Sequence, residues 1–248
     1  AESVTAKILP FFKSSARRFH QDIVHHRWPA ELEIMLAKRT LHFDRVAFDF
    51  IEKHPDAQII ILACGLDSRF ERIGYPEVDW FVLDLPDVMS LRNQLLPHHP
   101  RVTEVSGSVL KPDWLSLLDP QRPTLIQAEG LLMYLPRQQI RALFRDLADY
   151  FKHAEFMAES AAYWLSQLMS EGLFKHALKH KMKLSGSTTY LGGLRHAREP
   201  ESWHPSIRLL GEYGYFENWD AKMGLMNLLS LTPIKRLQWI VHYRLEKL

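Results

Sequence analysis

The sequence has little of what marks several large classes of protein. Its 248 residues contain one cysteine, Cys64, which excludes an intramolecular disulfide and a paired-cysteine zinc site. The longest unbroken apolar run, Ile59 to Cys64, is far shorter than the roughly 20 residues that a membrane-spanning helix needs. The 31 basic and 29 acidic side chains leave a net charge of +2, which gives no reason to expect a nucleic-acid partner. We therefore expect a soluble protein of the reducing cytoplasm that binds neither membranes nor nucleic acid.

The order of helical and extended patterns predicts an α/β fold. Between Glu31 and His54, apolar residues recur every three or four positions, as on one face of an amphipathic helix, and Pro55 ends the pattern. Short apolar runs then alternate with predicted helices, one ending at Leu96 and one beginning at Pro136. The predicted strands are Gln58–Ala63, Asp79–Asp84, Arg101–Val105, Thr124–Ala128 and Ala154–Ala158. Such alternation is typical of a doubly wound (Rossmann-type), mostly parallel sheet covered on both faces.

The pattern is looser after Ser160. Apolar residues at helical spacing between Trp164 and Phe174 precede a basic stretch, Lys175 to Lys183, and a polar loop. We interpret this part as an inserted helical cap, and Leu237–Arg244 as a strand added antiparallel at the edge of the sheet. The prediction is a single domain (1–248) with an N-terminal helical cover (1–55), a ligand-binding α/β core (56–160), a cap (161–210) and closing edge strands (211–248).

The ends of the first two predicted strands point to a nucleoside ligand. In open α/β sheets, ligands bind beyond the carboxyl ends of the strands. Gly65 follows the first strand, where the missing Cβ lets a ligand approach the backbone, and Asp84 ends the second strand 19 residues later. A carboxylate at about this separation commonly accepts hydrogen bonds from ribose hydroxyls. Taken singly, a turn explains the glycine and a helix cap the aspartate, but their joint spacing favours a ligand.

The same loop argues against a dinucleotide. Only one glycine of a G-x-G-x-x-G motif is present, and Asp67 stands where it would repel a pyrophosphate. An adenosine compound without phosphates fits better, and S-adenosylmethionine has both the ribose and a cationic sulfonium that tolerates nearby carboxylates. A dinucleotide-dependent oxidoreductase is an alternative that only a bound nicotinamide cofactor would revive.

Four motifs follow one another in the chain at characteristic separations. They are Leu62–Arg69 (LACGLDSR), Phe81–Pro86 (FVLDLP), Gly107–Trp114 (GSVLKPDW) and Ala128–Pro136 (AEGLLMYLP). Together they resemble the leucine carboxyl methyltransferase family, and within it the bacterial branch that is similar to the tetracenomycin polyketide O-methyltransferase. The resemblance implies a class I methyltransferase fold, a seven-stranded sheet with its last strand antiparallel, and S-adenosylmethionine as the methyl donor.

The resemblance also implies roles for single residues at the donor's amino-acid end. Arg39 corresponds to a family arginine that pairs with the donor's carboxylate, for which its planar fork is suited. Glu129 corresponds to an acid that faces this end of the donor, and a ligand ammonium or a neighbouring arginine would equally offset its charge. Tyr134 lies about one turn further on, towards the methyl acceptor, and is the one residue to which we assign a catalytic part.

Gly65 and Asp84 match the family's motif glycine and ribose carboxylate, and we expect their neighbours Asp67 and Leu85 to line the donor site too. Two positions depart from the family pattern. Ala63 stands where the family usually has glycine, the mildest of replacements. Ser108 stands where an aspartate often meets the adenine amino group, and serine keeps the ability to accept a hydrogen bond.

The acceptor side is less well defined. A carboxylate acceptor is already ionised at neutral pH, whereas a hydroxyl needs a base, and no histidine–aspartate pair stands out. Candidates from the cap are the histidines His153, His196 and His204, the arginines Arg195, Arg198 and Arg208, and the aromatic residues Trp164, Tyr190 and Trp203. Surface or packing roles explain the histidines and arginines more simply, and core packing explains the aromatic residues as well as a pocket does. Neither His25–His26 nor His98–His99 has the spacing of a metal site, so no metal is expected.

The sequence thus predicts an S-adenosylmethionine-dependent O-methyltransferase, monomeric or homodimeric, that acts on a carboxylate or hydroxyl of a small metabolite such as a polyketide. An alternative is a catalytically silent member that docks an acidic carrier protein through Lys175 to Lys183. A solvated helix face explains the same lysines more simply.

Overall fold

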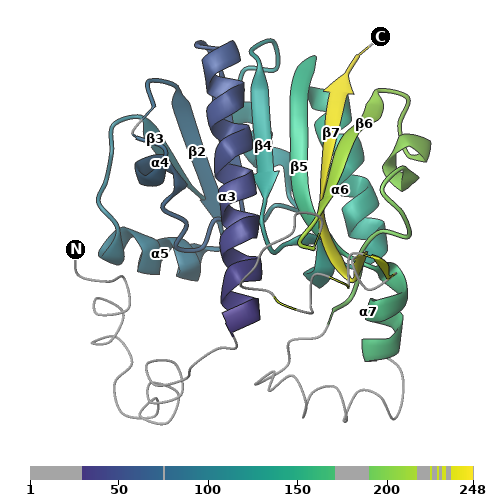
Figure 1. Ribbon diagram of the computed structural model, residues 1–248. Helices are drawn as coiled ribbons and strands as arrows, with labels where there is room; N and C mark the ends of the chain where they lie inside the picture. The colour runs from purple at the N-terminus through teal and green to yellow at the C-terminus, as the bar shows by residue number, and fades with distance from the viewer. Residues whose placement is uncertain are drawn as a thin grey trace.

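The computed structural model describes residues 30–74, 76–170, 190–216, 224, 228, 231–232 and 236–247. These residues form one seven-stranded sheet in the order β3-β2-β1-β4-β5-β7-β6 (Figure 1). The strands are β1 (Gln58–Leu62), β2 (Asp79–Asp84), β3 (Val102–Ser106), β4 (Thr124–Ala128), β5 (His153–Ala161), β6 (Ile207–Gly214) and β7 (Gln238–Glu246). Strands β1 to β5 pair in parallel, and β7 pairs antiparallel with both β5 and β6. This is the doubly wound, mostly parallel sheet that the sequence predicts.

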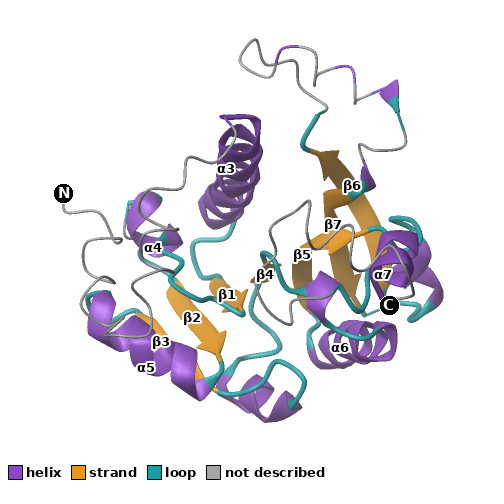
Figure 2. Ribbon diagram, turned by 90° about the horizontal axis from the view of Figure 1, so that it is seen from below, coloured by secondary structure: helices purple, strands orange, loops and turns teal. Residues whose placement is uncertain are grey.

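Helices cover both faces of the sheet (Figures 1 and 2). They are α3 (Ala30–Lys53), α4 (Arg69–Arg72), α5 (Pro86–Leu95), α6 (Arg137–Tyr150), α7 (Tyr163–Ser170) and the 3-10 turns η2 (Pro112–Leu117), η3 (Leu132–Tyr134) and η4 (Glu199–Ser202). Alternate residues of β1 serve two cores: Ile59 and Ile61 pack with α3 and α4, whereas Ile60 and Leu62 pack with α6. All five residues of β1 are therefore buried, which explains why this strand reads as an unbroken apolar run.

Most predicted elements are confirmed to within a few residues, and two features differ. The prediction that the last strand lies at the edge of the sheet is wrong, because β7 lies between β5 and β6. The edge strand on this side of the sheet is β6, which the sequence did not reveal and which begins inside the range assigned to the cap. Its pattern is broken by a register shift between Leu209 and Gly211, and bulges of this kind are frequent in edge strands.

In the described ranges, none of the helices combines the length and the apolar character that crossing a membrane requires. The basic stretch Lys175 to Lys183, Leu173 and Phe174 lie outside the described residues, so carrier docking through these lysines stays a prediction.

Candidate functional site

The loops that follow β1 and β2 meet at the carboxyl edge of the sheet, which is the edge seen in Figure 2. The backbone N–H of Gly65 donates a hydrogen bond to Asp84 Oδ2 at 2.7 Å, and the N–H of Leu85 donates to Asp84 Oδ1 at 2.7 Å. Each carboxylate oxygen has two acceptor positions, so one position on each remains for a ligand hydroxyl. The predicted proximity of Gly65 and Asp84 is thus present in the structure.

The backbone after β1 turns through two left-handed residues. Ala63 has φ +52° and Gly65 has φ +49°. A Cβ built on Gly65 would meet no protein atom within 4 Å, so open space adjoins this backbone, as the approach of a ligand requires. Among the residues that the structure describes, Ala63 is the one non-glycine residue with a positive φ, and it stands where the family pattern usually has glycine. The alanine therefore adopts a glycine conformation and bears its strain.

A buried arginine ties this loop to the neighbouring strand. Arg69 is 1% exposed, and its guanidinium contacts Asp44, Asp67, Gln127 and Glu129 at 2.6–3.1 Å. Arg72 lies 2.8 Å from Asp44 and 3.2 Å from Asp67. The charge of Asp67 is consequently offset by two arginines, so its predicted repulsion of phosphate is weaker than the sequence suggested.

Arg39 extends from α3 to the ends of β4 and β5. Its Nε lies 2.8 Å from Glu129 Oε1, and its Nη1 donates a hydrogen bond to Glu159 Oε2 at 3.0 Å. Burial by itself would lower the pKa of Arg39, but Glu159 and Glu129 more than offset this effect and raise it. Although Nε is buried and close to Glu129, it forms no well-aligned hydrogen bond with any described residue. Nε is thus ion-paired with Glu129, and a ligand carboxylate at this guanidinium would share it with that glutamate.

Two cavities flank the Gly65–Asp84 contact. One, of about 270 Å³, is lined among others by Arg39, Ala63, Asp67 and Glu129. The other, of about 560 Å³, is lined among others by Leu85, Ser108 and Trp114. In spatial order, the site has a polar cavity, the Asp84 carboxylate and a larger, more apolar cavity. This order matches the amino-acid end, the ribose and the adenine of an S-adenosyl compound. The predicted donor residues therefore lie together and fit this group.

Tyr134 and Tyr190 lie next to each other, and Tyr134 ends the turn η3, which contacts β5. Tyr134 is 42% exposed, and its ring meets that of Tyr190 edge-on with 5.8 Å between centroids. Burial and the charge of Glu159 raise the pKa of Tyr134, and burial first and then Tyr134 and Glu159 raise the pKa of Tyr190 to about 12. Both phenols are therefore protonated at neutral pH and able to donate hydrogen bonds, and the hydroxyl of Tyr190 accepts one from Gln238 Nε2 at 2.5 Å.

The segment that carries Tyr190 is held by a close backbone approach. Leu191 donates a backbone hydrogen bond to Met133 at 2.8 Å, and a Cβ on Gly192 would lie 2.0 Å from the carbonyl oxygen of Leu135. Only glycine fits this contact. Gly192 thus allows the segment of Tyr190 to lie against the turn that carries Tyr134, and nothing in the sequence pattern had singled it out.

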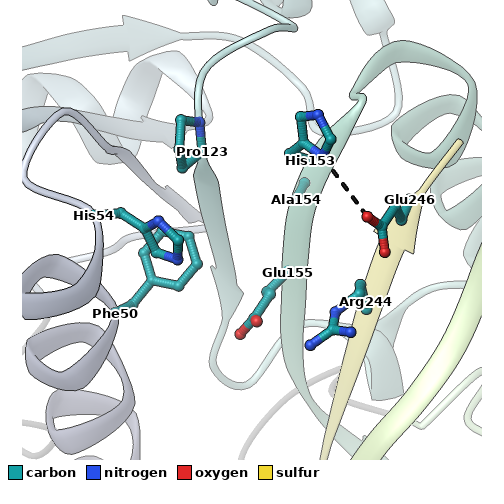
Figure 3. Close-up of a pocket in the computed structure, with 8 residues that line it drawn as sticks. All are labelled: Phe50, His54, Pro123, His153, Ala154, Glu155, Arg244 and Glu246. Atoms are coloured by element: carbon teal, nitrogen blue, oxygen red, sulfur yellow. Dashed lines mark ion pairs between the residues drawn. The ribbon is translucent and has the colours of Figure 1, made fainter.

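Several predicted acceptor-side residues lie elsewhere. His153 begins β5 at the opposite edge of the sheet, beside a cavity of about 300 Å³ where its Nδ1 is 3.9 Å from Glu246 (Figure 3). His204 pairs with Asp149 at the end of α6, and Trp203 is buried against Phe144. The hypothesis that His153 and His204 reach the site is wrong for a topological reason: both contact the amino-terminal edge of the parallel strands.

The predicted clamp arginines do not converge either. Arg198 pairs with Glu201 on its own turn, and exposed Arg208 contacts the carbonyl oxygen of Ile207. Arg195, His196 and Trp164 do line one cavity of about 440 Å³ beyond the end of β5. Cys64 is buried and burial raises its pKa to about 12, which agrees with its interpretation as a packing residue. Within the described ranges no three histidine, cysteine or acidic side chains are arranged to hold a metal ion.

Two solved structures of similar fold are those of methyltransferases. The N-methyltransferase NodS from Bradyrhizobium japonicum WM9 aligns with a TM-score of 0.53 at 10% identity, over 86% of this chain and 97% of that one. The magnesium protoporphyrin IX methyltransferase from Synechocystis PCC 6803 also gives 0.53 at 10% identity, over 98% and 99%. At these identities the likeness concerns the fold alone. Together, sheet order and site define a class I S-adenosylmethionine-dependent methyltransferase fold.

The sequence comparisons define the family. The model of the leucine carboxyl methyltransferase family matches residues 5–148, and this chain belongs to that family, which uses S-adenosyl-L-methionine. The tetracenomycin polyketide synthesis O-methyltransferase TcmP of Streptomyces glaucescens is 28% identical over 203 residues, 82% of this chain and 72% of TcmP. A putative S-adenosyl-L-methionine-dependent methyltransferase of Mycobacteroides abscessus is 32% identical over 159 residues. The match spans 60% of this chain and about half (51%) of that protein.

Proposed function

We propose that this chain transfers a methyl group from S-adenosylmethionine to an oxygen atom of a small metabolite, with a carboxylate as the favoured acceptor. The observation that carries the proposal is the Gly65–Asp84 contact between two cavities of unequal polarity, with Arg39 and Glu129 at the polar end. The similarity to TcmP supports oxygen as the acceptor atom and a polyketide-like metabolite as its source.

The donor is held at three places. Arg39 presents its guanidinium to the donor's carboxylate, and Glu129 receives the donor's ammonium while Arg69 Nη2 holds that glutamate at 2.6 Å. Asp84 accepts hydrogen bonds from the ribose hydroxyls, at the acceptor positions of its two oxygens that the N–H groups of Gly65 and Leu85 leave unused. The adenine lies in the cavity of Leu85 and Ser108. Asp67 lines the polar cavity but has its charge engaged by Arg69 and Arg72, so its part is to shape the loop.

Bound here, the donor supplies a methyl group already activated by the positive sulfur. The acceptor oxygen attacks the methyl carbon in line, the carbon–sulfur bond breaks, and its electron pair stays on sulfur, leaving neutral S-adenosylhomocysteine. The protein then has to orient the two reactants, an effect that can lower the barrier by several kcal/mol. Tyr134 and Tyr190, both protonated, suit an acceptor that is already an anion because they donate hydrogen bonds to it.

The residue ranges fit this division of labour. We propose that 56–160 bind the donor, that 1–55 and 161–210 cover donor and acceptor, and that 211–248 complete the sheet. Monomer and homodimer are both compatible with the proposal.

The experiment is an assay of S-adenosylhomocysteine release over a panel of aromatic carboxylic acids and matched phenols. We expect turnover of carboxylic acids and a labelled product that releases methanol in alkali, as a methyl ester does. An alkali-stable ether would contradict the carboxylate, and an N-methylated product would contradict oxygen as the acceptor.

A second experiment tests the donor assignment without needing the acceptor. Arg39→Lys keeps the charge but loses the planar fork, and calorimetry should show S-adenosylhomocysteine binding at least tenfold weaker. Arg45→Lys is the matched control, since Arg45 lies on the same helix, is 81% exposed and pairs with Asp49 at 3.8 Å. Equal affinity of the two variants would refute the role of Arg39.

A further inference from the structure

Glu159 is a buried carboxylate at the carboxyl end of β5 that the proposed donor contacts do not use. Its side chain is 2% exposed, and both of its oxygens have partners. Oε1 accepts a hydrogen bond from the hydroxyl of Tyr215, and Oε2 accepts one from Arg39 Nη1 at 3.0 Å. A charged group at this depth is costly unless it is paired, and Arg39 supplies the opposite charge.

The three residues come from distant parts of the chain. Arg39 is on α3, Glu159 on β5, and Tyr215 follows β6. Figure 1 shows α3 lying against one face of the sheet. Arg39 on this helix contacts Glu159 near the carboxyl end of β5. Tyr215 is 3% exposed and packs with Phe43 and Met157, which fixes its ring and therefore its hydroxyl.

The geometry points to Glu159 and Tyr215 as positioning residues that orient Arg39 for the donor's carboxylate. Glu159 engages Nη1, at one end of the guanidinium, and so fixes the plane of the Nε–Nη2 edge, where Glu129 Oε1 lies 2.8 Å from Nε. The ligand's carboxylate would meet Nη2 on this edge and share Nε with Glu129. Two parallel N–H groups on one edge are what a bidentate carboxylate contact requires. This inference rests on the proposed function, because it gives a purpose to the assignment of Arg39.

The benefit is preorganisation. Arginine is a long side chain that loses much rotamer freedom when a ligand immobilises it, and this loss weakens binding unless the protein has already fixed the side chain. Releasing Arg39 from Glu159 should weaken donor binding by about 3- to 10-fold, which is the effect of immobilising one such side chain. The effect should be confined to ligands that possess a carboxylate.

The test compares two ligands on the same variants. S-adenosylhomocysteine has the amino-acid end, whereas methylthioadenosine keeps the adenine, ribose and sulfur but lacks that end. Glu159→Gln removes the charge with little change of shape, and Tyr215→Phe removes only the hydroxyl that holds Glu159. Calorimetry should show weaker S-adenosylhomocysteine binding by both variants and unchanged methylthioadenosine binding. Adding Tyr215→Phe to Arg39→Lys should cause no further loss.

The matched control is Tyr243→Phe. Tyr243 is buried like Tyr215, and its hydroxyl donates one hydrogen bond, to the carbonyl oxygen of Ala197 at 2.7 Å, on the other face of the sheet. This variant should lose thermal stability and keep the ratio of the two affinities.

The outcomes separate the positioning role from the donor site itself. If Arg39→Lys weakens S-adenosylhomocysteine alone but Tyr215→Phe and Glu159→Gln leave it unchanged, the positioning role is wrong and the donor site stands. If Arg39→Lys has no effect, the donor assignment itself fails. If Tyr215→Phe weakens both ligands equally, the tyrosine is a structural residue; this variant also decides the matter should Glu159→Gln fail to fold.

Discussion

Replacing Asp84 by asparagine is the sharpest test of the ribose contact, because the change removes one acceptor oxygen and the charge but almost no volume. In the native protein both oxygens accept a backbone N–H at 2.7 Å, from Gly65 and from Leu85. The amide that D84N introduces keeps only one oxygen, and its NH2 group faces a backbone N–H that it cannot satisfy.

The magnitude follows from the hydrogen bonds that are lost. A hydrogen bond to a charged group contributes about 1.5–3 kcal/mol, and D84N removes at least one such bond to a ribose hydroxyl. The expected loss of affinity for S-adenosylhomocysteine is therefore about 10- to 100-fold. The unsatisfied N–H should also cost about 1 kcal/mol of stability, a fall of about 2–4 °C in Tm for a chain of this size.

The assay is isothermal titration of the folded variant with S-adenosylhomocysteine. Asp87→Asn is the control, since Asp87 is an exposed carboxylate in the first turn of α5, three residues further on. An affinity of D84N within about twofold of the native value, in a protein that melts cooperatively, would refute the ribose assignment.

Three further predictions follow from single contacts. Ala63→Gly should raise stability by about 0.5–1 kcal/mol in thermal melts, because glycine relieves the positive φ of +52° although it is more flexible when unfolded; a lower Tm would contradict the strain. Gly192→Ala should cost about 1–3 kcal/mol and raise the acceptor KM, because its Cβ would lie 2.0 Å from a backbone oxygen, whereas Gly211→Ala meets nothing within 4 Å and should do neither. His42 is stacked on Tyr213, and burial, with His242 and Arg45, lowers its pKa to about 4 from 6.5. Below pH 6.5 the unfolded chain therefore binds a proton at His42 that the native protein does not bind, so the free energy of unfolding falls as the pH falls towards 4. His42→Phe should flatten this dependence of stability on pH in urea titrations. An unchanged dependence would exclude His42 as its cause.

The sheet was largely predictable because its central strands are buried on both faces. Gln58–Leu62 and Thr124–Ala128 are entirely buried, and a strand of this kind reads as an apolar run between turn residues. The edge strand β6 was missed because Arg208, Gly211 and Glu212 break its pattern, and because edge strands need less burial. The place of β7 inside the sheet depends on pairing between distant segments, which no local pattern records.

The candidate donor site was predictable where topology alone brings residues together. Parallel strands end at the same edge, so Gly65 and Asp84 had to be neighbours, and the 2.7 Å contact agrees. The contact of Arg39 with Glu159 joins residues 120 positions apart, and no spacing rule reaches so far. A charged residue at the end of a buried strand was the available signal, and both Glu129 and Glu159 carry it.

Arg69 shows the opposite limitation. It lies within the first motif, yet its role as the buried centre of four polar contacts was not assigned. An arginine that is 1% exposed is rare enough to require several partners, but burial of a single long side chain cannot be read from its neighbours in sequence.

The most direct test of the central claim is a crystal structure of the protein with S-adenosylhomocysteine. We predict that the ligand's carboxylate lies against Arg39, its ribose hydroxyls on Asp84 and its adenine in the cavity of Leu85 and Ser108. A ligand bound with its ribose away from Asp84, or outside both cavities beside the Gly65 loop, would contradict the proposed donor site.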